Sequence, residues 1–367
     1  MPPPPQAELG ETVSPDDAAA TPDVAPEPRS TEPPPPHFRF APDADVLIET
    51  EIVPLFARLA DDAQHLQNAV IRHCSNETAV TRQALEAAFT ATVVDASKLL
   101  PLSFGSEAAE VMPSRLLTEA ASTVFSRNRL AGLMEGVVPA PQSLAALRQE
   151  EAGLMGLSAL ERLLLARSYK STDTLANRCR LALTIAANVR VSVAAALESW
   201  RTRDVAEHWA SSDEELADRL RLRDLIQGTI DAVDRFDRDV AEFARERRNN
   251  GEVPFAQPQN GMAYLASLAE GLVEQMRRLN MYADPGGDAE AALAQISTAL
   301  MAGCERLLAA KEGDEATYLV AFDQAHADII DRLPELFGFD ATAFNRPLTS
   351  FELQRPEGEA EAAPETQ

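Results

Sequence analysis

The sequence has few of the residues on which several protein classes depend. Three of its 367 residues are cysteine, five are histidine, and aromatic residues make up 5%. Three cysteines without zinc-type spacing exclude a disulfide-rich scaffold and a zinc finger. Alternating runs of Val, Ile, Thr and Tyr, which predict strands, are nearly absent as well. The sequence therefore argues against small disulfide-stabilised domains and against β-sandwiches and barrels.

Positive charge and long apolar runs are also scarce. The chain has 33 Lys and Arg against 58 Asp and Glu, a formal net charge of −25. Such a chain repels phosphate groups, so neither nucleic acid nor an anionic membrane surface is an expected partner. No stretch approaches the roughly 18 consecutive apolar residues that span a bilayer. The N-terminus lacks the basic and apolar regions of a secretory signal, which leaves two alternatives: a cytoplasmic protein, or an exported one without its signal.

Proline is abundant, and it is concentrated at one end of the chain. Residues 1–40 contain 12 of the 25 prolines, with acidic residues and alanine between them. Such a segment cannot bury enough apolar surface to offset its conformational entropy. We therefore expect residues 1–42 to form a disordered spacer, and the acidic residues 348–367 to form a disordered tail.

Between these tails, apolar residues recur with helical periodicity, and capping residues, Pro and Gly interrupt them at intervals. One expected helix runs from about residue 143 to residue 168. The charged run at residues 231–248 is typical of a solvated helix face with i,i+4 ion pairs. The length allows two average domains. We predict an all-α fold of two tandem antiparallel helical bundles, residues 43–169 and 170–347.

The stretch GLMGLSALERLLL, residues 153–165, places a hydroxyl and a carboxylate in an apolar helical segment. Ser158 and Glu161 are spaced i,i+3 and share a helix face. Since a carboxylate in an apolar face is costly unless paired or used, two alternatives are open. Both side chains can bind a polar ligand, or Ser158 can bond back to the carbonyl of Leu154 while Glu161 pairs with an arginine. The arginines considered as partners are Arg148, Arg162 and Arg178.

Sequence signals for known catalytic sites are missing around Ser158. No G-x-S-x-G elbow is present, and a serine inside a helix without an adjacent base is not activated as a nucleophile. The H-E-x-x-H pattern of metallopeptidases is absent too, and the five histidines are scattered. These absences argue against a serine hydrolase and against a helix-borne zinc peptidase site.

Four segments carry landmarks in a recognisable order. Residues 84–105 are similar to an A-W-x-x-A helix that runs into an F-G-P loop, and residues 153–165 are similar to a G-x-H-x-x-E signature followed by leucines. Residues 177–200 match a helix that begins with R-C and ends on Trp, and residues 336–347 contain an L-G-F segment. Together they resemble the imelysin family of helical two-bundle proteins of the bacterial envelope, over about residues 44–347.

The G-x-H-x-x-E signature is the part of the resemblance that implies a metal- or ligand-binding site. Gly156 and Glu161 match it, whereas Ser158 stands where the family has His. In the family, His and Glu face a cavity between the bundles and are the proposed metal-binding or catalytic groups. Imidazole nitrogen and carboxylate oxygen suit iron or zinc, but a neutral hydroxyl is a poor ligand and no general base near pH 7. The resemblance therefore implies Glu161 as the metal- or ligand-binding residue, with Ser158 and Gly156 beside it.

The R-C landmark supplies secondary candidates. Arg178 and Cys179 begin this helix, and two alternatives are open for the thiol. Cys179 can be a buried free cysteine beneath a surface arginine, or it can form a disulfide with Cys74 that ties the two bundles together. An oxidising periplasm permits the disulfide.

The resemblance implies a periplasmic protein linked to iron or metal uptake. It is expected to be non-catalytic and to bind iron, another divalent metal or a small polar ligand in a cavity between the bundles. Two other classes remain open. One is an imelysin-type metallopeptidase, for which a second strong metal ligand is not evident. The other is a structural or interaction module of the cell envelope that binds envelope proteins.

Overall fold

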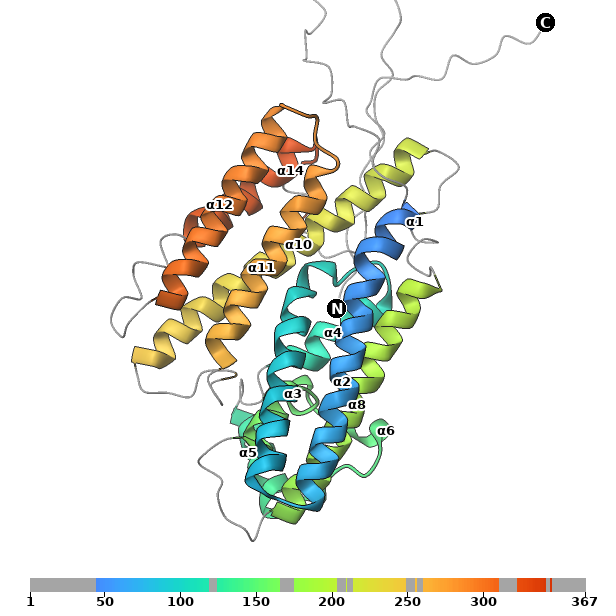
Figure 1. Ribbon diagram of the computed structural model, residues 1–367, viewed down its shortest axis with the longest axis vertical. Helices are drawn as coiled ribbons and strands as arrows, with labels where there is room; N and C mark the ends of the chain where they lie inside the picture. Colours follow the sequence, from blue (N-terminus) through green and yellow to red (C-terminus); the bar gives the residue numbers. More distant parts are fainter. Residues whose placement is uncertain are drawn as a thin grey trace, which may run out of the picture. The chain divides into compact units, whose positions relative to one another are not determined.

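The regular structure of the chain is helical throughout the part that the computed structural model describes. The described residues are 44–118, 124–165, 175–202, 209, 214–248, 255, 260–309, 322–340 and 344. Every regular element in these ranges is a helix (Figure 1), which confirms the predicted all-α fold. The predicted tails lie outside the described residues. From Pro36 onward the chain clusters as one compact unit, and the predicted division near residue 170 stays a prediction.

Ten helical elements precede residue 166 in the described ranges. They are α1 (Ala44–Leu47), η1 (Ile48–Ile52), α2 (Val53–Ser75), α3 (Ala79–Lys98), η2 (Leu100–Leu102), α4 (Glu107–Leu117), α5 (Val124–Glu135), α6 (Leu144–Leu147), η3 (Ala152–Leu154) and α7 (Leu157–Leu164). Side-chain caps fix several starts: Thr78 accepts from the N–H of Thr81 before α3, and Ser106 accepts from the N–H of Ala109 before α4.

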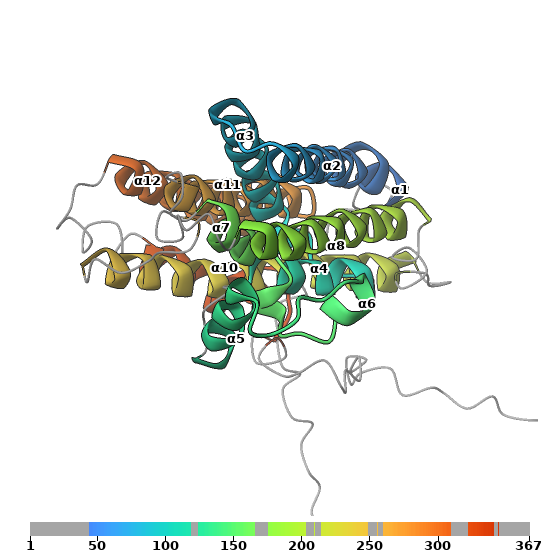
Figure 2. The ribbon, with the colours of Figure 1, turned by 90° about the horizontal axis from the view of Figure 1, so that it is seen from below.

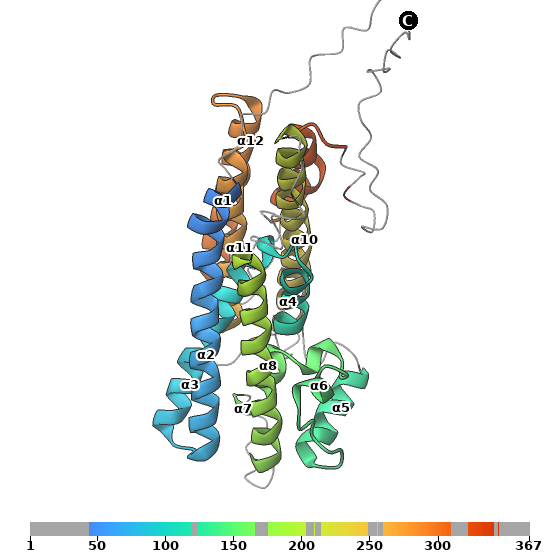
Figure 3. The ribbon, with the colours of Figure 1, turned by 90° about the vertical axis from the view of Figure 1, so that its right-hand side faces the viewer.

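Six further elements complete the described fold. They are α8 (Leu175–Arg201), α10 (Glu214–Arg248), α11 (Asn260–Asn280), α12 (Asp288–Ala309), η5 (Asp328–Arg332) and α14 (Leu333–Leu336). Helix α8 packs against α2, α4 and α7, and Figure 2 shows it between α2 and α4. Helices α5 and α6 each pack against α8 (Figure 3). Helix α11 packs against α10 and α12, and its contact with α3 joins the two sets of helices.

Helix α8 is a core helix. It is long and apolar enough, by length and composition, to cross a membrane. Its side chains are largely buried, and they include Arg178 and Asn188. The Asn188 amide donates to the backbone carbonyl of Met155 at 3.2 Å. An apolar helix that is packed on several sides is typical of the interior of a helical bundle.

The prediction of one continuous helix over residues 143–168 is wrong. The structure divides this region into α6, a turn, η3 and α7, and Leu154 therefore lies in a different element from Ser158. The physical reason lies at Gly156, whose backbone is extended (φ −119°, ψ −164°). A Cβ added there would lie 2.5 Å from the carbonyl oxygen of Arg115 at the end of α4. Glycine permits this close approach, so α7 starts afresh against α4.

Candidate functional site

Helix α7 carries its two polar candidates into the interior. Ser158 is 1% exposed and Glu161 is 5% exposed, and the other residues of α7 except Arg162 are buried too. Glu161 lies one turn after Ser158 on the same helix, as its i,i+3 spacing requires. A carboxylate buried to this degree needs hydrogen-bond donors around it.

One donor to Glu161 comes from a distant segment. The backbone N–H of Phe255 donates to Oε2 of Glu161 at 2.9 Å across 94 residues of sequence. In the described ranges, Phe255 is the one non-glycine residue with a positive φ, at 57°. A bulky residue in the left-handed region is strained, and such strain persists where the surroundings over-determine it, often at functional sites.

The ring of Phe255 connects Glu161 to a second polar group. It lies 4.9 Å, centroid to centroid, from the ring of Tyr264 on α11, and 6.3 Å from the ring of Phe89 on α3. The hydroxyl of Tyr264 donates to Asp239 on α10, and Arg235 donates from Nε to the same hydroxyl at 3.2 Å. We refer to Glu161, Phe255, Tyr264, Asp239 and Arg235 as the Glu161 centre.

Within the Glu161 centre, the charges of Arg235 and Asp239 compensate each other. Arg235 Nε lies 3.3 Å from Asp239 Oδ2, and its Nη2 donates to the carbonyl of Leu117 at 2.6 Å. Burial lowers the pKa of Arg235, but Tyr264 and Asp239 outweigh burial and raise it. Burial raises the pKa of Tyr264 well above its usual range, so the phenol keeps its proton at neutral pH. Arg235, Asp239 and Tyr264 therefore form one hydrogen-bonded network, and the ring of Phe255 connects it to Glu161.

The secondary candidates support the far end of α7. Cys74 at the end of α2 forms a disulfide with Cys179 on α8, so the disulfide alternative is the one that the structure contains, and Cys304 is a buried free cysteine. Arg178 donates from Nη1 to the carbonyl of Leu163 at 3.1 Å. Arg178 and the disulfide thus tie α7 to α8 and α2. Arg148, another of the arginines considered for Glu161, donates to the side chain of Asn188 at 3.3 Å.

Iron, which the resemblance implies, does not fit the donor set in the described part of the chain. No three His, Cys, Asp or Glu side chains gather there closely enough to hold a metal ion. Ser158 offers a hydroxyl, and the described partner of Glu161 is a backbone N–H, which cannot ligate a cation. We therefore derive no chemistry through a metal at this centre.

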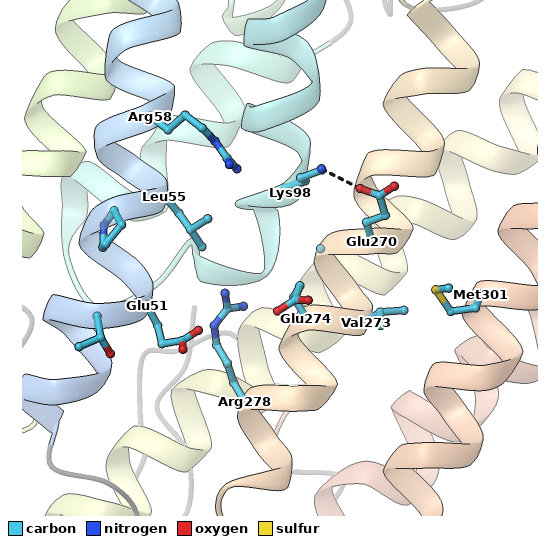
Figure 4. Close-up of a pocket in the computed structure, with 12 residues that line it drawn as sticks. Glu51, Leu55, Arg58, Lys98, Glu270, Val273, Glu274, Arg278 and Met301 are labelled. Atoms are coloured by element: carbon cyan, nitrogen blue, oxygen red, sulfur yellow. Dashed lines mark ion pairs between the residues drawn. The ribbon is translucent and has the colours of Figure 1, made fainter.

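A pocket of about 490 Å³ opens among η1, α2, α3, α11 and α12 (Figure 4). Its volume falls within the usual range for small-molecule sites. Glu161, Ser158 and Gly156 do not line it. The lining residues are Thr50, Glu51, Pro54, Leu55, Arg58, Lys98, Glu270, Gly271, Val273, Glu274, Arg278 and Met301. We call this cavity the Arg278 pocket.

Acidic and basic side chains alternate around the Arg278 pocket. Lys98 pairs with Glu270 at 2.7 Å, and Arg58 pairs with Asp95 at 2.6 Å. Arg277, beside the pocket, pairs with Glu274 at 2.9 Å and also with Glu51. Sequence reasoning missed this pocket because its residues come from five separate helical elements. The doublet of arginines at 277 and 278, in which one must face inward on an amphipathic helix, is the signal that could have indicated it.

Comparisons with known proteins identify the fold. No family model matches the sequence, and no curated protein matches it significantly. An imelysin-like protein from Psychrobacter arcticum 273-4 has a similar structure, with a TM-score of 0.61 and 15% identity, over 81% of this chain and 95% of that one. A protein from Parabacteroides distasonis ATCC 8503, named as a candidate iron-regulated protein A precursor, has a TM-score of 0.52 and 11% identity, over 80% and 95%.

These similarities bear out the expected resemblance at the level of the fold. They span most of the described helices and nearly the whole of both solved chains. At such low identity, a shared fold does not carry over a site or an activity. The chain has the all-α fold of imelysin-like proteins.

Proposed function

We propose that this chain is a non-catalytic, imelysin-like binding protein of an oxidising extracytoplasmic compartment, and that Glu161 anchors a small polar ligand. The observation that carries the proposal is the buried carboxylate of Glu161, held by the N–H of a strained residue from a distant segment. An ionised carboxylate only accepts hydrogen bonds, so the ligand must bring donors such as an ammonium or hydroxyl groups. Ser158, one turn before, offers a hydroxyl.

The absence of catalysis follows from the chemistry at the signature. Ser158 replaces the imidazole that the family pattern has at this position, and a serine hydroxyl is not a general base near neutral pH. The phenol of Tyr264 keeps its proton, and Arg235 is committed to Asp239, Tyr264 and Leu117. A peptidase assay on a denatured protein substrate should therefore show no cleavage. Cleavage that disappears in Glu161→Gln would support the metallopeptidase alternative.

Two observations support the proposed location in an oxidising extracytoplasmic compartment. The disulfide between Cys74 and Cys179 is of a kind that forms and persists in oxidising environments such as the periplasm. The Parabacteroides distasonis protein of similar fold is named as a precursor. Quantifying free thiols under denaturing conditions, in protein collected from its native cells, checks this part of the proposal. One free thiol per chain is expected, and three would contradict it.

A thermal-shift screen of small amines and polyols tests the role of Glu161. Compounds that stabilise the wild-type chain should lose their effect in Glu161→Gln, which keeps the shape of the side chain but removes its charge. A matched control is Glu198→Gln on α8, an exposed position. If no stabilising compound depends on Glu161, or if both variants respond alike, the anchoring role is wrong.

An iron-related role is the second candidate, because the Parabacteroides distasonis protein is named as iron-regulated. Titration calorimetry with Fe²⁺ under anaerobic conditions, and with Zn²⁺, separates the two candidates. The polar-ligand proposal expects no tight binding by the wild type. It expects Zn²⁺ binding by Ser158→His, which restores an i,i+3 His and Glu pair, and its loss when Glu161→Gln is added. Tight Fe²⁺ binding by the wild type that requires Glu161 would favour the iron role instead.

A further inference from the structure

We propose that the Arg278 pocket binds a small amphipathic organic carboxylate, with Arg278 as the residue that receives its carboxylate group. The pocket is separate from the Glu161 centre, and the proposal does not depend on what Glu161 binds. It stands on three observations: a buried guanidinium that forms no ion pair with a described residue, surrounding charges that balance only when Arg278 is counted with them, and an apolar wall.

Arg278 is buried far more deeply than the other charged residues that line the pocket. The residue is 3% exposed, and its Nε has no hydrogen-bond partner among the described residues. Its one described side-chain bond is weak, from Nη1 to Oε1 of Gln275 at 3.3 Å. Burial lowers its pKa, and neither Glu51 nor Glu274 forms an ion pair with it. A buried charge in this state is destabilising and gains from an anionic partner.

The surrounding charges select a singly charged ligand. Glu51 and Glu274 are both held by Arg277, and Glu270 is held by Lys98. In Figure 4 the guanidinium of Arg278 lies between the carboxylates of Glu51 and Glu274. Lys98 balances Glu270, and Arg277 together with Arg278 balances the two carboxylates, so the surroundings carry no net charge. A doubly charged phosphate would therefore add more unbalanced charge, and meet more repulsion from these two carboxylates, than a singly charged carboxylate. A planar carboxylate also matches the fork of a guanidinium.

The rest of the pocket suits an apolar tail. Leu55 on α2, Val273 on α11 and Met301 on α12 line it, and Met301 is 48% exposed. Gly271 lets α11 approach the end of α3 closely, since a Cβ there would lie 2.6 Å from the carbonyl oxygen of Lys98. This contact fixes Lys98 and Arg278 on opposing walls of one cavity. A carboxylate with a short alkyl chain can therefore satisfy Arg278 while its tail covers these side chains.

Titration calorimetry with sodium octanoate on the full chain tests the proposal. Saturable binding is expected, and Arg278→Met, which keeps the length of the stem, should weaken it at least about tenfold, because a charge-assisted bond in a buried site is lost. The same variant should melt at an equal or higher temperature than the wild type, since a buried unpaired charge has been removed. The affinity for 1-octanol, which has no carboxylate, should be the same in the wild type and in Arg278→Met.

Three further variants make the test specific. Arg306→Met removes an exposed arginine of α12 that does not line the pocket, and it should bind octanoate as the wild type does. Met301→Trp alters an exposed side chain and fills the cavity, and it should weaken octanoate about tenfold without loss of folding. Glu161→Gln should leave octanoate binding unchanged, so the test of this proposal is independent of the test of the Glu161 proposal.

Three outcomes would overturn the proposal. They are an octanoate affinity that changes less than twofold in Arg278→Met, the lack of saturable octanoate binding, and tighter binding of inorganic phosphate than of octanoate.

Discussion

Two arginines of this molecule lie inside the fold to different degrees, and their charges are held in opposite ways: the side chain of Arg235 is 20% exposed, whereas Arg278 is 3% exposed. In the Glu161 centre, Arg235 on α10 contacts Asp239, Tyr264 and the carbonyl of Leu117, and its pKa is raised. In the Arg278 pocket, Arg278 on α11 lacks an ion-pair partner in the described part of the chain, and its pKa is lowered by burial. A buried charge compensated within the chain contributes to the fold, whereas an uncompensated one is available to a ligand.

The comparison predicts that the contacts which hold the helices around the Glu161 centre stabilise the fold. The disulfide should make the largest contribution to the free energy of unfolding. Replacing Cys74 and Cys179 together by serine opens a closure of 105 residues, which in the chain-entropy description costs about 4–5 kcal/mol. Denaturation by guanidinium chloride measures it. Cys304→Ser, at a buried free thiol, is the control and should cost much less. Equal midpoints for the double variant and the wild type would break the first half of the comparison.

The second effect sharpens the contrast between the two arginines. Arg235→Met leaves the carboxylate of Asp239 and the carbonyl of Leu117 without their shared donor, so a loss of about 3 kcal/mol in the free energy of unfolding is expected. Arg238→Met, at an exposed position three residues on, is the matched control and should change little. If Arg235→Met and Arg278→Met shift the unfolding midpoint by the same amount, the two charges contribute equally to stability. The contrast between a compensated and an uncompensated arginine would then be wrong.

The third effect concerns how α7 is seated. Gly156→Ala places a methyl group 2.5 Å from the carbonyl oxygen of Arg115 and 2.6 Å from that of Leu116. These are backbone atoms of α4, so they cannot relieve the clash by changing rotamer as a side chain can. A loss of about 1–3 kcal/mol is expected, because overpacking forces the start of α7 away from α4. Gly132→Ala is the control, since its methyl would meet only the side chain of Val138 at 3.1 Å. Equal effects of the two substitutions would show that the close approach at Gly156 is not tight.

Helical periodicity was sufficient to predict the fold, and it was insufficient for the site. The all-α class follows from local residue patterns, whereas the helix expected over residues 143–168 failed because Gly156 meets the backbone of α4, a contact that no local pattern contains. The charged run at residues 231–248 does form the i,i+4 pair of Arg235 and Asp239. The pattern did not indicate that this pair turns toward Tyr264, since the partner comes from another helix.

The resemblance located Glu161, but not its partners or the pocket. The role of Glu161 as a metal or ligand residue stays a prediction, as do those of Ser158 and Gly156. Phe255 could not have been identified, because a backbone N–H is common to nearly all residues and its position depends on long-range packing. Arg278 was hidden for a related reason: the sequence shows a pair of arginines, while the burial of one of them is decided by α2, α3 and α12.

The smallest predicted effect is a pH dependence at Asp62, which interacts with Arg58, a residue that lines the Arg278 pocket. Burial, a hydrogen bond with Asp95 and repulsion by Asp95 raise the pKa of Asp62 to about 6, although Arg58 and His65 oppose this. Because the folded pKa lies above the unfolded value of 3.8, the folded state binds the proton more tightly, and this stabilisation is lost as the pH rises from about 4 to about 6. Solvent screening should keep this change in the free energy of unfolding below about 1 kcal/mol.

The variant Asp62→Asn mimics the protonated form of Asp62. Its melting temperature should therefore equal that of the wild type near pH 4 and exceed it near pH 7. Asp61→Asn, at an exposed neighbouring position, should not show this rise, and a difference for Asp62→Asn that is constant across pH would mean that Asp62 and Asp95 do not share a proton.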